Sequence, residues 1–338
     1  MSHSPVRPTT IPYITAREPN GRVKGTPMQQ KSSNPTSPAA LSLAVSGLGR
    51  SSWLVTPGAS PGRFATAADA RADVALLDLE DSVPAPLKDE ARTYVLRFLR
   101  RVGLAENRPS AFIGVRVNAP DTLDGLKDLT GLAEHGLWPA LLLVPKVESA
   151  RDVELVLRIM GDSTAPSEVW ALIESPRAMQ NLTGILHAPR LGGVVFGAAD
   201  YAAEAGCKIT SRAMWYPRAM LAAAAATVGL PAVDSPYFTL PDLDGLRREA
   251  EESAELGFVG KVAIHPAQLP VIQAAFRPSQ GDLEAARAVI SAAEAADGAI
   301  TTVGGAMVGP PIVAAARALT ARAGQVPALP LSKESDHE

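Results

Sequence analysis

The sequence VWALIESPRAMQNLTGILHAPRLGGVVFGAADYAAEAG occupies residues 169–206 and decides the expected fold. Its two apolar runs, residues 169–173 and 193–197, each lead to a carboxylate: Glu174 directly and Asp200 after two alanines. Pro176 can open a helix over residues 176–186, because the first turn of a helix does not need its N–H group. Strand, helix and strand at this spacing predict a βαβ unit with both acids at the carboxyl ends of parallel strands.

Two roles are open for these acids. Ligands bind at the carboxyl ends of the strands in α/β folds, and two carboxylates brought together there repel each other unless a cation lies between them. Oxygen ligands on a rigid scaffold favour Mg²⁺, which needs only one or two carboxylates. Alternatively, Glu174 and Asp200 are ordinary helix caps or loop acids. The spacing by itself leaves both roles open.

The rest of the chain alternates strands and helices around this unit. Further strands are expected at residues 53–55, 74–77, 112–117, 141–144, 231–233 and 260–264, and helices at 61–70, 88–101, 151–160, 212–228 and 243–256. Pro217 is expected to interrupt or delay the helix at 212–228. Eight strands alternating with helices predict an α/β fold, a (β/α)₈ TIM barrel. A doubly wound open sheet is the alternative, disfavoured because no G-x-G-x-x-G motif follows the first strand.

Four regions are expected along the chain. Residues 1–48 are rich in Pro, Ser and Thr and predict a disordered arm, which is a transit segment, a non-functional extension or a misassigned start. The barrel is expected over residues 49–276. A C-terminal helical extension, with helices at 283–296 and 312–323, is expected over 277–325 as a lid or an oligomer arm. Residues 326–338 predict a disordered tail.

The composition limits the class of protein. Of the 338 residues 46% are hydrophobic, which is enough for a substantial core. The net charge of −3 argues against a nucleic-acid partner. A single cysteine, Cys207, excludes an intrachain disulfide and fits a reducing, cytoplasmic location; we expect it to be buried. The sequence has no apolar run long enough to span a membrane and no signal-peptide core.

Polar residues mark the ends of the expected strands. In a barrel these residues converge on one mouth. They are Glu80, Asp81, Arg116, Lys146, Glu174, Asp200 and His265. Together they predict a cation bound by acids, with an arginine that grips a carboxylate through two hydrogen bonds. Each also has an ordinary alternative: the acids as caps, Arg116 paired with a neighbouring acid, Lys146 as a solvated strand end and His265 as a hydrogen-bonded turn residue.

Seven segments, in this order, carry a resemblance to a known family. They are TPGASPGRF (56–64), ADVALLDLEDSV (72–83), VRVN (115–118), VPKVESARDVE (144–154), ALIESPRAM (171–179), VFGAADYAAEAG (195–206) and KVAIHPAQLPVI (261–272). On these segments the sequence resembles the HpcH/HpaI aldolase–citrate lyase beta-subunit family, the CitE-like group, and the resemblance covers roughly residues 51–323.

The resemblance implies a Mg²⁺-dependent carbon–carbon lyase that acts on an acyl-CoA or carrier-bound thioester and a 2-oxo acid such as glyoxylate, pyruvate or oxaloacetate. It also implies a homotrimer or a dimer of trimers. Glu174 and Asp200 would ligate the metal, and Glu80 and Asp81 would hold metal-bound waters. Arg116 would bind the 2-oxo acid, with Glu80, Asp81 and Lys146 as further catalytic candidates. Arg63, Gly197 and Ala198 would contact the substrate.

One position departs from the family pattern. Thioester lyases of this group carry an aspartate in a C-terminal G-x-M-[IV]-D-x-P segment, but here residues 305–311 read GAMVGPP, with Gly309 in its place. A glycine cannot move a proton through a side chain, and such groups contribute about 10²–10⁴-fold in rate. We therefore expect weak or absent lyase activity with metal and 2-oxo acid binding intact. A thioester hydrolase, a binding subunit and substitution by another acid such as Asp81 are the alternatives.

Overall fold

The computed structural model describes residues 49–104, 110–161 and 167–325. The arm predicted at residues 1–48 and the tail predicted at 326–338 lie outside the described residues. No helix in the described ranges is both long enough and apolar enough to cross a membrane.

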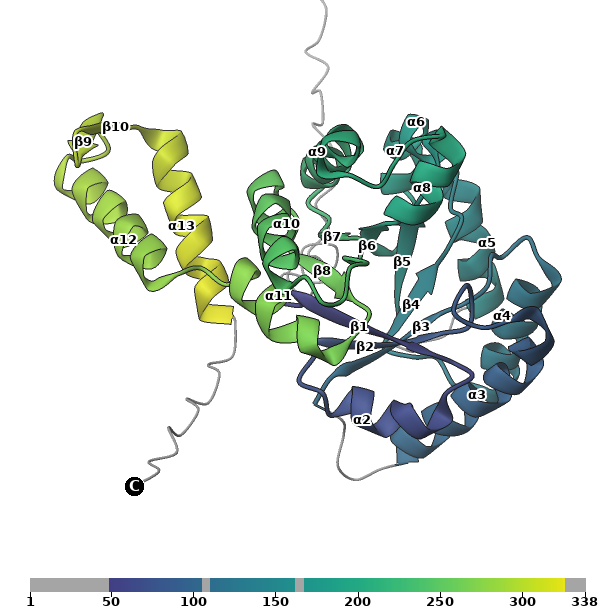
Figure 1. Cartoon of the computed structure of the whole chain (residues 1–338). Coiled ribbons are helices and arrows are strands. Elements are labelled where there is room, and N and C mark those ends of the chain that lie inside the picture. The colour runs from purple at the N-terminus through teal and green to yellow at the C-terminus, as the bar shows by residue number, and fades with distance from the viewer. Residues whose placement is uncertain (1–48, 105–109, 162–166, 326–338) are drawn as a thin grey trace, which may run out of the picture. The chain divides into compact units, whose positions relative to one another are not determined.

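Eight parallel strands close into a barrel in chain order, and the last pairs with the first (Figure 1). They are β1 (Ser52–Pro57), β2 (Val74–Asp78), β3 (Phe112–Arg116), β4 (Leu141–Val144), β5 (Glu168–Ile173), β6 (Leu191–Phe196), β7 (Ala232–Asp234) and β8 (Gly260–Ala263). The closure confirms the predicted (β/α)₈ barrel and excludes the doubly wound alternative.

Helices follow the strands and cover the outside of the barrel (Figure 1). They are α2 (Phe64–Ala68), α3 (Lys88–Leu104), α4 (Leu123–His135), α5 (Ala150–Met160), α6 (Pro176–Gln180), α7 (Leu182–Leu186), α8 (Ala198–Ala205), α9 (Ser211–Thr227), α10 (Leu243–Leu256) and α11 (Leu269–Phe276). Short 3₁₀ turns precede three of them: η1 (Pro61–Arg63), η2 (Ala85–Leu87) and η3 (Pro266–Gln268).

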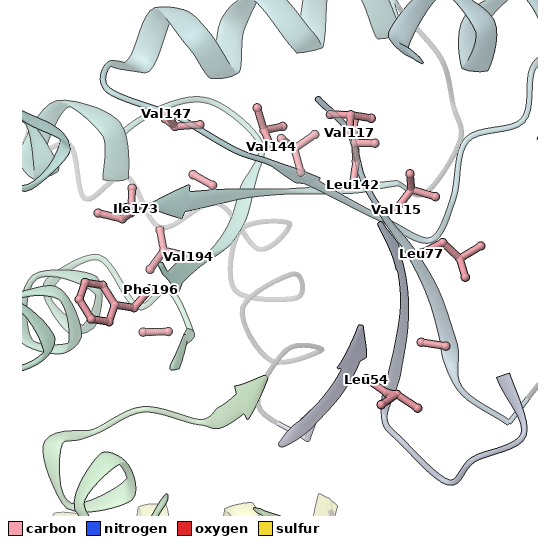
Figure 2. Close-up of a cluster of buried hydrophobic side chains, with 14 of the residues drawn as sticks. Leu54, Leu77, Val115, Val117, Leu142, Val144, Val147, Ile173, Val194 and Phe196 are labelled. Atoms are coloured by element: carbon pink, nitrogen blue, oxygen red, sulfur yellow. The ribbon is translucent and has the colours of Figure 1, made fainter. Parts of the chain in front are cut away.

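Alternation along the strands separates two buried layers, because successive side chains of a strand point to opposite faces. The inner layer includes Trp53 and Trp170, whose rings meet edge to face at 4.7 Å. The outer layer packs under the helices; Figure 2 shows its strand residues, among them Leu77, Val115 and Ile173. The residue after each of these three therefore points into the barrel at its carboxyl-terminal end, called here the mouth.

Several local predictions were wrong. The helix predicted at 176–186 is two short helices, α6 and α7, divided at Asn181, whose amide donates to the Glu148 carbonyl at 2.8 Å. Helix α9 runs through Pro217 without interruption. Cys207 is exposed rather than buried, because it directly follows Gly206, the left-handed residue that ends α8. Helices α4 and α11 were not predicted.

The C-terminal extension is helical, as predicted, but contains a hairpin. Helix α12 (Gln280–Ala295) and helix α13 (Pro310–Gln325) pack against each other. Between them the glycine-rich segment forms the antiparallel strands β9 (Thr301–Val303) and β10 (Ala306–Val308). Gly304 and Gly305 form the turn with φ angles of 58° and 83°, which favour glycine. Gly309 follows β10 and precedes α13.

Candidate active site at the barrel mouth

A buried ion pair forms the floor of the mouth. Asp78 and Arg116 end β2 and β3 as register partners, and both point inward. The Arg116 guanidinium donates through Nε to Asp78 Oδ1 at 2.6 Å and through Nη2 to Oδ2 at 2.7 Å. Burial alone would raise the pKa of Asp78, but the charge and hydrogen bonds of Arg116 outweigh it and lower that pKa. Arg116 is thus paired with a neighbouring acid, the ordinary alternative considered for it.

Three further acids surround the ammonium group of Lys146. Its Nζ lies 3.9 Å from Glu80 Oε1 and 3.5 Å from Glu174 Oε1, and it is hydrogen-bonded to Asp200 Oδ2. Glu80 and Glu174 are buried, whereas the side chain of Asp200 is 38% exposed. These three acids, Glu80, Glu174 and Asp200, are called the acidic cluster. The predicted convergence of these strand-end residues is therefore present in the structure.

The acidic cluster has too little positive charge around it. Burial, followed by repulsion from Glu80, raises the pKa of Glu174 to about 8. Burial raises the pKa of Glu80 to about 7, although Arg116 opposes the shift. Arg116 Nη1 lies 2.7 Å from Glu80 Oε2, yet that buried oxygen accepts no hydrogen bond. Acids with raised pKa values and an unsatisfied buried oxygen are the expected signs of a site for a cation.

The donor set fits a hard divalent cation. The carboxyl groups of Glu174 and Asp200 lie within hydrogen-bonding range of each other. Gly197 leaves room for them, because a Cβ there would come within 2.7 Å of Glu174 Oε2. The described residues contain no group of three or more His, Cys, Asp or Glu side chains arranged around one metal position. Mg²⁺ does not require one, since it usually keeps several waters and takes one or two carboxylates.

The other predicted residues lie in less central positions. Asp81 has a 62% exposed side chain that lies 3.8 Å from Arg116 Nη1. Arg63 is exposed in η1 and, among the described contacts, forms no ion pair with the acidic cluster. Gly197 caps α8, and Ala198 is buried at its first position. His265 caps η3 and accepts a hydrogen bond from the backbone of Ala267, as a turn histidine does.

A lysine that the sequence did not single out holds the loop after β2. Lys88 Nζ donates to the carbonyl oxygens of Leu79 at 2.8 Å and Glu80 at 2.7 Å, and to Asn118 Oδ1 at 2.6 Å. Asn118 in turn donates to Leu79 and to the buried carboxylate of Asp128. These contacts fix the backbone that carries Glu80. Lys88 gave no sequence signal, because its acceptors are mainly backbone atoms.

The position of the missing aspartate is sterically open. A Cβ on Gly309 would meet no atom within 4 Å, and its φ is not positive. Gly309 and Asp297 line one cavity of about 500 Å³ between α12 and α13. Asp297 is therefore an acid that shares this cavity with the position that lacks a side chain.

Fold and site define a (β/α)₈ barrel with a cluster of acidic side chains at its mouth. The chain belongs to the HpcH/HpaI aldolase/citrate lyase family, whose sequence model matches residues 51–266. A second model, of C–C bond lyases of the TIM-barrel fold, matches residues 221–323. The predicted family is thereby confirmed.

Curated relatives cover most of the chain. A citrate lyase subunit beta-like protein of Mycobacterium tuberculosis is 36% identical over 281 residues, covering 81% of this chain and 95% of its own length. A (3S)-malyl-CoA thioesterase of Cereibacter sphaeroides is 36% identical over 248 residues, covering 73% of this chain and 84% of its own length. An L-malyl-CoA/beta-methylmalyl-CoA lyase of the same species is 33% identical over 270 residues, covering 72% of this chain and 84% of its own length.

Solved structures share the fold. The protein CitE from M. tuberculosis, in complex with magnesium, acetoacetate and coenzyme A, is 35% identical and superposes with a TM-score of 0.69 over 81% of this chain and 98% of that one. A citrate lyase beta subunit from the same organism, complexed with oxaloacetate and magnesium, is 34% identical with a TM-score of 0.58 over 69% of this chain and 100% of that one.

Proposed function

We propose that the protein is a Mg²⁺-dependent carbon–carbon lyase that cleaves or joins an acyl thioester and a 2-oxo acid. The observation that carries the proposal is the acidic cluster at the mouth, with raised pKa values for Glu80 and Glu174 and Arg116 beside it. Magnesium, when bound, polarises a keto oxygen and stabilises the alkoxide that develops. The magnesium and oxaloacetate of the related citrate lyase beta subunit support this choice of cation and 2-oxo acid.

Each side chain at the mouth has a proposed role that follows from its position. Glu174 and Asp200 would hold the metal, and Glu80 and Asp81 would bind waters next to it. Glu80 lies next to both Arg116 and Lys146, so its carboxyl group would face the metal site and the 2-oxo acid together. Arg116 would attract the carboxylate of the 2-oxo acid with its Nη1 edge, which lies 2.7 Å from Glu80 Oε2 and would be shared with that glutamate. Its Nε and Nη2 atoms donate to Asp78, so the pair of hydrogen bonds to a carboxylate that the sequence predicted is made to that acid and not to the substrate.

The remaining contacts concern the thioester substrate. Gly197 and Ala198 begin α8, where backbone N–H groups favour an anionic ligand. Arg63 would contact an anionic group from the loop after β1. Coenzyme A is the proposed carrier, supported by the coenzyme A in the related CitE structure; a carrier protein is the alternative.

A thioester hydrolase is the second candidate. The relative named as a (3S)-malyl-CoA thioesterase favours it, and so does Gly309, which removes the acid expected at the end of the hairpin. Glu80 could then activate water rather than assist C–C cleavage. A barrel that binds Mg²⁺ and a 2-oxo acid without turnover remains the third expectation.

One experiment separates the candidates. The protein is incubated with Mg²⁺, each of glyoxylate, pyruvate and oxaloacetate, and a panel of acyl-CoA esters, and the products are identified by mass spectrometry. Longer acyl-CoA products indicate the lyase, run in the direction of synthesis, and free CoA without a new C–C bond indicates the hydrolase. Because of Gly309 we expect slow turnover, below the typical range of about 1–10³ per second. The Glu174→Ala variant serves as the control that should lose either activity.

Assembly and location follow from the same proposal. We propose a cytoplasmic homotrimer or dimer of trimers, with a barrel at residues 49–276 and an arm at 277–325 that serves as a lid or contacts a second subunit. Exposed apolar side chains on the arm support the second role: Ile300, Met307 and Ile312. Analytical ultracentrifugation of the full chain and of a chain lacking residues 277–338 tests it, and an unchanged oligomer would contradict the role of the arm.

A further inference from the structure

Lys146 has a backbone conformation that is unusual for a lysine. Its φ of +54° lies in the left-handed region, which residues with a Cβ rarely adopt. The conformation is held by Glu174 Oε1, which accepts a hydrogen bond from the Lys146 backbone N–H at 2.8 Å. The same carboxylate oxygen lies 3.5 Å from the ammonium of this residue. Backbone and side chain of Lys146 are thus both directed at one acid of the cluster.

The ammonium contacts both acids proposed as metal ligands. It is hydrogen-bonded to Asp200 and lies within ion-pair distance of Glu174. An ammonium group and a divalent cation both need these oxygens, and they repel each other at contact distance. Full engagement of the two acids by a metal therefore requires the ammonium to withdraw.

A second place for the ammonium lies next to the cluster. The Lys146 side chain is 40% exposed and also lines a cleft of about 320 Å³. Three acids share that lining, Asp121, Glu148 and Asp152, and outnumber its one other cation, Arg177, which pairs with Glu148. Because the backbone of Lys146 is anchored, rotation about its four side-chain bonds is enough to carry the charge from the cluster into this acidic cleft.

We propose that Lys146 is a built-in competitor for the divalent cation, and that its ammonium moves between the acidic cluster and the adjoining cleft as the cation binds. The inference rests on the proposed metal site and deepens it. It makes Lys146 a residue that sets metal affinity rather than one that transfers protons. The strained backbone is consistent with such a role, since strain is retained where the surroundings impose it.

The test is a calorimetric titration of the full-length protein with MgCl₂. Two variants remove the ammonium: Lys146→Met keeps the length of the side chain, and Lys146→Gly relieves the positive φ. Both should bind Mg²⁺ more tightly, on the order of tenfold, because a unit charge near a divalent ion is removed. Lys127→Met is the matched control, because it removes the same charge from an exposed lysine paired with Asp89 on the outer helices. Its affinity should stay within about twofold, since distant surface charges are screened.

The outcomes separate this inference from the proposed function. Affinity that is unchanged or weaker in both Lys146 variants would overturn the competition while leaving the metal site in place. Absence of Mg²⁺ binding in the parent and in every variant would overturn the metal site and this inference with it. As a second readout, Mg²⁺ at a fixed concentration should raise the unfolding temperature of the Lys146 variants more than that of the parent, because a ligand that binds the native state more tightly stabilises it more.

Discussion

Arg116→Lys will destabilise the protein as well as weaken its affinity for 2-oxo acids. The guanidinium makes two hydrogen bonds, of 2.6 and 2.7 Å, to Asp78, whose side chain is fully buried. A lysine keeps the charge but cannot form both bonds, and a hydrogen bond to a charged group is worth roughly 1.5–3 kcal/mol. Arg116→Met also removes the charge, and an uncompensated buried carboxylate costs roughly 3–5 kcal/mol. The order of stability should be parent, lysine variant, methionine variant.

Urea unfolding at pH 7 measures these differences in the free energy of unfolding. Arg177→Lys is the control, because Arg177 is 71% exposed and its pairing with Glu148 should contribute less than about 1 kcal/mol. A methionine variant within about 0.5 kcal/mol of the parent would refute the reasoning, since surface substitutions alone vary by that much. Calorimetry with glyoxylate, pyruvate and oxaloacetate completes the experiment. If Arg116→Lys binds all three acids as the parent does, the arginine is purely structural.

Three other predictions concern the metal, the pH and the C-terminal glycine. Glu174→Ala and Asp200→Ala should each abolish Mg²⁺ binding in calorimetry; unchanged affinity in both would remove the central claim. Burial raises the pKa of Glu80 from 4.5 to about 7 and that of Glu174 from 4.5 to about 8. Their contribution to the free energy of unfolding is therefore complete below about pH 4.5, falls as the pH rises, and is lost once the pH has passed 7 to 8. Thermal unfolding in EDTA should show this decline, Mg²⁺ affinity should rise over the same interval, and flat profiles would contradict both. Gly309→Asp should raise C–C cleavage or thioester hydrolysis, by up to about 10²–10⁴-fold, and a rate equal to that of the parent would exclude the missing acid as the cause of slow turnover.

The barrel was predictable because its signals are local. Each strand is a short apolar run and most crossovers have helical periodicity, although α4 was not predicted, so the strand ends could be placed without knowing how the strands pair. The pairing of Asp78 with Arg116 was not predictable in this way, because it depends on the register between β2 and β3. Asp78 directly follows the predicted strand at residues 74–77, but only the register shows that it faces Arg116.

Other differences arise from backbone conformation. The hairpin of β9 and β10 had a usable signal, since two adjacent glycines between short apolar runs favour a turn with two positive φ angles. Cys207 was judged by its residue type, whereas its exposure follows from its place after the left-handed end of α8. The position of the Lys146 ammonium had no signal at all, because a positive φ at a lysine cannot be anticipated from composition or spacing.

The charge balance of the mouth links this fold to its chemistry. Apart from Asp81, whose side chain is 62% exposed and therefore screened by solvent, four carboxylates, those of Asp78, Glu80, Glu174 and Asp200, face two cationic side chains, Arg116 and Lys146. With every acid ionised the deficit is two charges, which a divalent cation would neutralise. Arg116 makes its two hydrogen bonds to Asp78 and only partly offsets the charge of Glu80, so the deficit falls on the acidic cluster, where two of the three pKa values are raised. A cation at the cluster would restore these acids to their ionised forms, and the chemistry that follows then depends on which acid, if any, the C-terminal arm supplies in place of Gly309.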